Sequence, residues 1–129
     1  MIYFVYPGDL TKATGGYHYD RRLIGELRSI GIEMETVALP NCSSMPDQQT
    51  LNSVQQTLAA LPDQAVFIVV GLAFDVLDEL AVKEARRLRL VALCHHPLAL
   101  ETGLDESNRQ ALLFSERRAL ECARATVVT

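Results

Sequence analysis

The chain has 129 residues, enough for one domain with a single hydrophobic core. Hydrophobic residues make up 49% and charged residues 22%, a balance typical of soluble globular proteins and not of disordered ones. The formal charge of −4 is mild, so composition gives no reason to expect a nucleic-acid partner. Apolar runs are far shorter than the roughly 20 residues that cross a bilayer, and no signal peptide is visible. The three cysteines are odd in number and lack C-x-x-C spacing, so a cytoplasmic location is expected.

Five short apolar runs predict five strands along the chain. In order they cover residues 2–6, 34–39, 65–70, 90–94 and 125–128. Runs without polar alternation are typical of strands that are covered on both faces of a sheet. Between consecutive runs lie segments in which the apolar residues have helical spacing.

Four helices are predicted between these strands, in chain order. The first presents Leu23, Ile24, Leu27 and Ile30 and ends at Gly31. The second is capped by Asp47, presents Leu51, Val54, Leu58 and Leu61, and ends before Pro62. The third is capped by Asp75 and presents Leu77, Leu80, Ala81, Ala85 and Leu88. The fourth opens at Ser107 or a neighbour and presents Leu112, Leu113, Ala119, Leu120 and Ala123.

This alternation predicts one α/β domain over residues 1–129, with a doubly wound, Rossmann-like parallel sheet of about five strands. The expected strand order is 3-2-1-4-5, with the switch point between the first and fourth strands. Because the chain stops with the fifth strand, we expect the fold to be incomplete at its C-terminus.

Ligands of such sheets bind at the carboxyl ends of the strands, near the switch point. Gly15 and Gly16, after the first strand, can leave backbone N–H groups facing an anion at a helix start, although they could equally serve a tight turn. The pattern is neither G-x-G-x-x-G nor a P-loop, so no nucleotide cofactor is expected.

Two histidines, His95 and His96, end the fourth strand. Adjacent strand residues point to opposite faces, so the pair is not expected to chelate one metal. A histidine at this position can hydrogen-bond a ligand in the cleft, or it can be a structural histidine bonded to a loop carbonyl.

Three stretches of the chain resemble the N-terminal domain of GT-B glycosyltransferases of family 4. The glycine pair opens a helix in TGGYHYDRRL, residues 14–23, and the fourth strand ends in LVALCHHP, residues 90–97. The later LFSERRAL, residues 113–120, runs into ATVVT, residues 125–129, and is similar to the family's "SE…L…A…VVVTS" stretch.

The resemblance implies part of a two-domain enzyme that transfers a sugar from a nucleotide-sugar donor to a sugar or lipid-sugar acceptor, with retention of configuration. It implies that Gly15 and Gly16 bind the donor diphosphate and that His95 is the catalytic candidate, which orients the donor sugar. Tyr17, Asp20, His96 and Glu101 are then candidate acceptor or cleft contacts, by placement. The family's second, donor-binding domain has no counterpart here, so the chain alone is expected to be inactive.

Other interpretations stay open. A flavodoxin-like or receiver-like regulatory module is the main alternative, and an interaction domain that recruits another chain is a third. Arginines on helix faces, at 86, 87, 89, 117 and 118, are read as solvated, with peripheral membrane contact as a lesser alternative. An uncovered sheet face near Val127 and Val128 would favour a homo-oligomer.

Overall fold

The computed structural model describes residues 1–8, 10–11, 15–40, 47–70, 78–95 and 103–129. Five strands alternate with helices along this part of the chain: β1 (Ile2–Pro7), α1 (Gly15–Ser29), β2 (Met34–Leu39), α2 (Gln48–Ala59), β3 (Val66–Val70), α4 (Asp78–Glu84), β4 (Arg89–Cys94), α5 (Glu106–Cys122) and β5 (Ala125–Val128). All five predicted strands and the predicted α/β class are therefore confirmed. The predicted cap Asp75 and its neighbour Leu77 lie outside the described residues.

The five strands form one parallel sheet in the order β2-β1-β3-β4-β5. The predicted order 3-2-1-4-5 is wrong in one respect, because β3 lies between β1 and β4, not outside β2. The sequences of the strands give a physical reason. The β3 segment VFIVV is apolar on both faces and suits the centre of a sheet, whereas β2 carries Glu35 and Thr36, both exposed, and suits an edge.

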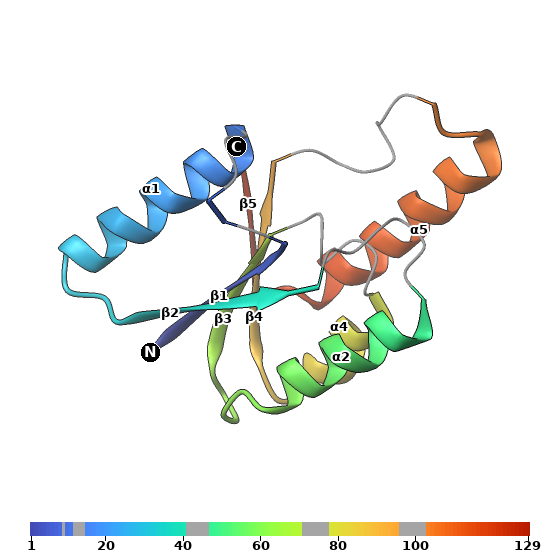
Figure 1. The fold of residues 1–129 in the computed structure, drawn as a ribbon. Helices are drawn as coiled ribbons and strands as arrows, with labels where there is room; N and C mark the ends of the chain where they lie inside the picture. Colours follow the sequence, from blue (N-terminus) through green and yellow to red (C-terminus); the bar gives the residue numbers. More distant parts are fainter. Residues whose placement is uncertain (9, 12–14, 41–46, 71–77, 96–102) are drawn as a thin grey trace.

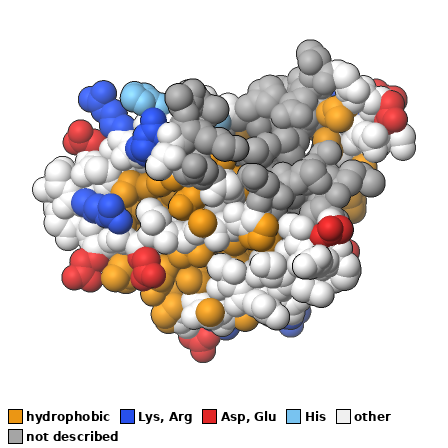
Figure 2. All heavy atoms as spheres, in the orientation of Figure 1, with side chains coloured by type: hydrophobic (Ala, Val, Ile, Leu, Met, Phe, Trp, Pro, Cys, Tyr) orange, Lys and Arg blue, Asp and Glu red, His pale blue; other side chains and the backbone are white. Residues whose placement is uncertain are grey.

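Helices cover the two faces of the sheet unequally, as Figure 1 shows: α1 lies on one side, and α2, α4 and α5 lie on the other. The core is divided accordingly. On the α1 side, Ile24 packs with Phe4 and Leu93 of the sheet. On the other side, Val54, Leu58, Leu88 and Ala119 pack with the opposite faces of the strands. The sheet edge at β2 is less covered, and apolar side chains gather over it between α1 and α2 (Figure 2).

The helix ends follow the predicted capping residues in most cases. Asp47 caps α2 by accepting a 2.7 Å hydrogen bond from the backbone N–H of Thr50. Gly31, with φ of +91°, follows the end of α1, a conformation that few residues other than glycine adopt. The N-cap of α5 is Asp105, two residues before Ser107, the residue at which, or near which, this helix is predicted to open.

Two residues predicted to face the core do not. Ile30 is 72% exposed, and α1 ends one residue earlier, at Ser29, so helical spacing no longer sets the direction of its side chain. Leu113 is also exposed, whereas Leu112 beside it is buried. The other apolar residues of α2, α4 and α5 named above that the structure describes are buried or half-buried.

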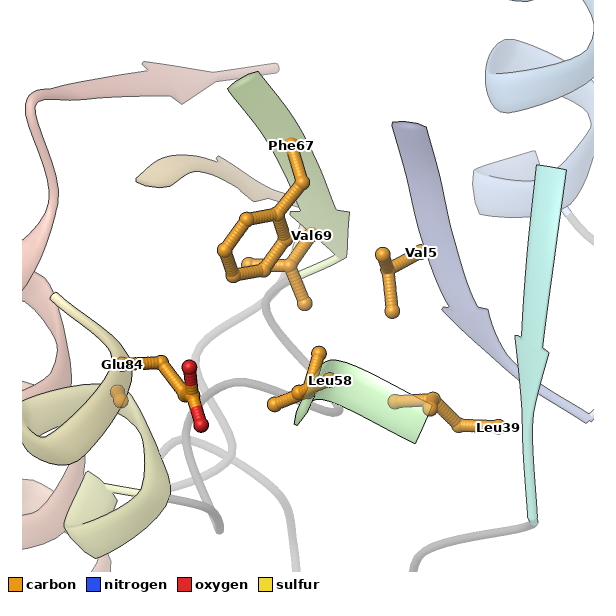
Figure 3. A pocket seen from close by; sticks show the side chains of 7 residues that line it. Val5, Leu39, Leu58, Phe67, Val69 and Glu84 are labelled. Atoms are coloured by element: carbon orange, nitrogen blue, oxygen red, sulfur yellow. The ribbon is translucent and has the colours of Figure 1, made fainter. Parts of the chain in front are cut away.

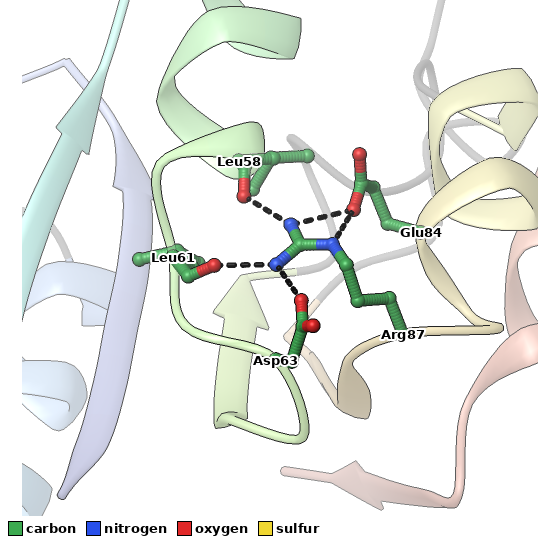
Figure 4. Close-up of polar contacts among 5 residues, drawn as sticks. All are labelled: Leu58, Leu61, Asp63, Glu84 and Arg87. Atoms are coloured by element: carbon green, nitrogen blue, oxygen red, sulfur yellow. Dashed lines mark hydrogen bonds and ion pairs between the residues drawn. The ribbon is translucent and has the colours of Figure 1, made fainter.

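Arg87, three residues after the end of α4, links this helix to the end of α2 (Figure 4). The Arg87 guanidinium donates to the carbonyl oxygens of Leu58 and Leu61 near the end of α2. It also pairs with Asp63 at 3.1 Å and with the buried carboxylate of Glu84 at 2.8 Å. Arg87 therefore both satisfies helix-end carbonyls and supplies the countercharge that a buried Glu84 requires.

Candidate functional site

His95 follows the last residue of β4 and lies at the carboxyl edge of the sheet, where the side chain is 18% exposed. Its imidazole bridges two elements far apart in the sequence. The Nε2 atom is 2.7 Å from Oδ1 of Asp20 in α1, and the Nδ1 atom is 2.8 Å from Oγ1 of Thr129, just after β5. The ring thereby joins the start of α1 to the ends of β4 and β5.

Asp20 is the buried partner in this group, with 1% of its side chain exposed. Its Oδ1 atom meets His95, and its Oδ2 atom is buried without a hydrogen-bond partner in the described part of the chain. Burial raises the pKa of the Asp20 carboxyl above its usual range, and the hydrogen bond and the charge of His95 partly oppose this rise. Burying the ionised carboxyl without a hydrogen bond would be costly, so its stability in the fold depends on the bond to His95.

Gly16 lies in the first turn of α1 and packs directly against the His95 ring. A Cβ atom at Gly16 would stand 3.2 Å from Cδ2 of His95, closer than most real Cβ contacts. Among the described glycines, positive φ values occur at Gly8, Gly31 and Gly103, whereas Gly16 lies within helix α1. Glycine at this position therefore serves the close approach of the histidine and not an unusual backbone conformation.

Neighbouring side chains of α1 fix the start of the helix to the end of β1. The hydroxyl of Tyr17 donates to the carbonyl oxygen of Pro7 at 2.5 Å, and Arg21 donates to the carbonyl oxygen of Leu10 at 2.6 Å. The Tyr19 ring meets the His95 ring edge-on, with centroids 5.3 Å apart and planes at 74°. These contacts hold the imidazole from one side and fix the position of the first helical turns.

The structure brings together three of the predicted site residues: Gly16, Asp20 and His95. Gly15 is the first residue of α1, and Tyr17 lies on the same turn with its hydroxyl toward β1. His96 and Glu101 lie outside the described residues.

Thr129 and Tyr19 were missed as neighbours of His95. The carboxyl-edge rule for parallel sheets could have suggested Thr129, because β4 and β5 are adjacent and end at the same edge. The pairing of His95 with Asp20, 75 residues away, has no signal in a single sequence.

A small cavity of about 10 Å³ lies away from this group, among β1, β2, β3 and the helices α2 and α4 (Figure 3). Its walls are apolar except for Glu84. That carboxylate is already bound by Arg87, and the volume is about the room needed by one water molecule. We therefore place no ligand in this cavity.

The His95 group can hydrogen-bond a ligand oxygen next to the start of a helix, where the helix dipole favours negative charge.

Within the residues that the structure describes, no three His, Cys, Asp or Glu side chains gather as metal ligands. No helix in the described ranges has the length and apolarity to span a membrane. No protein-family model matches the chain. A comparison with curated proteins also finds no match.

Proposed function

We propose that this chain is the N-terminal, acceptor-side domain of a retaining glycosyltransferase that uses a nucleotide-sugar donor. The observation that carries the proposal is the packing of His95, at the carboxyl end of β4, onto Gly16 in the first turn of α1. In an open parallel sheet this edge is where ligands bind, and a helix start there favours a phosphate group. The TGGYHYDRRL and LVALCHHP stretches that resemble family 4 both contribute to this group.

The proposed roles are those that the resemblance to family 4 implies. The backbone at Gly15 and Gly16 faces the donor diphosphate, and His95 contacts the donor sugar. The candidate acceptor or cleft contacts are Tyr17, His96 and Glu101, of which the last two lie outside the described residues. Asp20 is buried against His95, so we assign it to the support of the histidine and not to the acceptor.

Transfer itself requires a donor-binding domain in this class of enzyme, so we expect no turnover by the 129-residue chain. We also propose a cytoplasmic location and a sugar or lipid-linked sugar as acceptor. Self-association through the β5 end is a further proposal. It is supported by Val127 and Val128, which are 43% and 74% exposed.

Binding can be tested on the chain itself with ¹⁵N-labelled protein and UDP- or GDP-sugars at millimolar concentration. Amide resonances of Gly16, Tyr17 and His95 should shift, while those of Leu112 and Ala119 in α5 should not. Shifts that concentrate elsewhere, or none with any donor, would contradict the proposed site. An assay with labelled donor should meanwhile show only background transfer and hydrolysis.

A flavodoxin-like or receiver-like module is the second candidate, favoured by one observation: β2-β1-β3-β4-β5 is the strand order of flavodoxin-like domains. Fold alone does not assign an activity, however, and the order is compatible with both functions. Titration with FMN tests the flavodoxin-like form of this candidate, because a flavin module would quench the flavin fluorescence at micromolar concentration. A glycosyltransferase domain should leave it unchanged.

A further inference from the structure

We propose that Asp20 is a positioning residue that fixes the tautomer of His95, so that Nδ1 is the ring atom offered to a ligand hydroxyl. This inference rests on the proposed function, since it names the atom through which His95 would contact the sugar. The tautomer of the free protein can nevertheless be tested without any ligand.

The buried side of the imidazole decides where its proton lies. Nε2 is 2.7 Å from Oδ1 of Asp20, and that side chain is 1% exposed. A buried carboxylate can only accept, so Nε2 must carry a hydrogen. In neutral His95 the other nitrogen, Nδ1, is then unprotonated and has a lone pair to offer.

The outer side of the imidazole is the accessible one. Nδ1 is 2.8 Å from Oγ1 of Thr129, an exposed residue just after β5. A threonine hydroxyl can donate to Nδ1 and can rotate away at little cost. We infer that its oxygen marks the position that a ligand hydroxyl takes when it replaces Thr129 on the ring.

The ring has little freedom to present its atoms otherwise. Gly16 packs against its Cδ2 edge, and Tyr19 meets it edge-on from the same helix. In the described part of the chain, the titratable groups that the structure places against His95 are Asp20 and Tyr19, both in α1. A 180° flip of the imidazole would remove Nε2 from Asp20 and leave the buried carboxyl without its partner.

The tautomer can be read by NMR on protein with ¹⁵N-labelled histidine, in a pH series whose alkaline end shows the neutral imidazole. Two-bond ¹H–¹⁵N correlations should show His95 with Nε2 protonated and Nδ1 unprotonated. The opposite pattern in the unaltered chain would overturn the proposal, because it would mean that the carboxyl donates to Nε2. This measurement does not depend on any variant being folded.

Two variants then assign the cause. Asp20→Asn is nearly isosteric, and its amide can donate to Nε2, so the Nδ1–H tautomer should become the major form. Thr129→Val removes the hydroxyl from the other nitrogen and should leave Nε2 protonated. If Thr129→Val switches the tautomer and Asp20→Asn does not, Thr129 is the positioning residue and the proposal is wrong.

The ligand step is tested by adding UDP-glucose to the labelled chain. Binding should move the Nδ1 resonance of His95 while Nε2 keeps its proton and its position. A shift confined to Nε2 would refute the assignment of Nδ1 even though the ligand binds. If no donor binds at all, the proposed function fails while the tautomer result stands, so the two failures are distinguishable.

Discussion

The packing of Gly16 against His95 makes a testable prediction about two glycines of α1. Gly16 and Gly25 both lie on this helix, but they differ in their surroundings. A Cβ atom at Gly16 would be 3.2 Å from Cδ2 of His95, whereas a Cβ at Gly25 would meet no described atom within 4 Å. Replacing each glycine by alanine therefore adds the same methyl group in a crowded and in an open place.

The expected magnitudes follow from this difference. Alanine is favoured over glycine within a helix by about 0.5–1 kcal/mol, and Gly25→Ala should gain that amount. For a chain of this size the gain should raise Tm by about 2–5 °C. Gly16→Ala, in the first turn, gains no more than this and also pushes on the His95 ring, and such overpacking typically costs about 1–3 kcal/mol. With a gain of about 0.5–1 kcal/mol set against this cost, its net effect should be a loss of about 0–2.5 kcal/mol.

Urea and thermal unfolding of the 129-residue chain, followed by circular dichroism, measure both variants against the unaltered protein. The prediction is a difference of about 1–3 kcal/mol between the two alanine variants, with Gly25→Ala the more stable. If Gly16→Ala were as stabilising as Gly25→Ala, the ring would not be packed against the helix. The proposed site would then lose its central contact.

Three other predictions address stability, charge and association. Arg87→Ala should lower the free energy of unfolding by about 2–4 kcal/mol, because it leaves buried Glu84 unpaired. Arg86→Ala, at the exposed neighbouring position, is the control and should change the free energy of unfolding by less than about 0.5 kcal/mol. Urea unfolding measures both variants. Hydrogen bonds from Arg109 and Gln110 lower the pKa of Glu106 to about 2. Glu106 should therefore stabilise the folded chain at pH values above 4.5, its ordinary pKa, and this stabilisation should be lost as the pH falls toward about 2. Glu106→Gln should make the free energy of unfolding depend less on pH in that range. Light scattering should show a dimer or larger species that Val128→Lys converts to monomer; a monomeric parent chain at all concentrations would contradict association through β5.

The strands could be predicted because a short, uninterrupted apolar run bounded by turn residues is typical of a strand that is buried on both faces. Their order could be predicted only in part. The Rossmann order placed β3 at the sheet edge, although its VFIVV sequence has no charge to protect an edge, and the charged β2 was the better edge candidate. Helical spacing predicts a core position for Ile30, but the spacing does not tell where the helix ends, and α1 ends at Ser29, one residue before Ile30.

The candidate site was predictable to the level of loops. The carboxyl-edge rule selected Gly16 and His95, and the structure places them in contact. The hydrogen bond between His95 and Asp20 was not predictable, because the helix dipole alone explains an acidic residue near a helix start. Only the three-dimensional arrangement shows that Asp20 points inward and meets the imidazole.

The central claim is that His95 contacts the sugar of the donor while the start of α1 meets its diphosphate. The most direct test compares the affinities of UDP-glucose and pyrophosphate for the unaltered chain and for His95→Ala, by NMR titration. Resonances far from the site serve as the control for folding. We predict that His95→Ala lowers the affinity for UDP-glucose by about tenfold or more, because one hydrogen bond of about 1.5 kcal/mol is lost. The affinity for pyrophosphate should fall by less than about threefold. Equal losses for both ligands, or no loss for UDP-glucose, would contradict the claim.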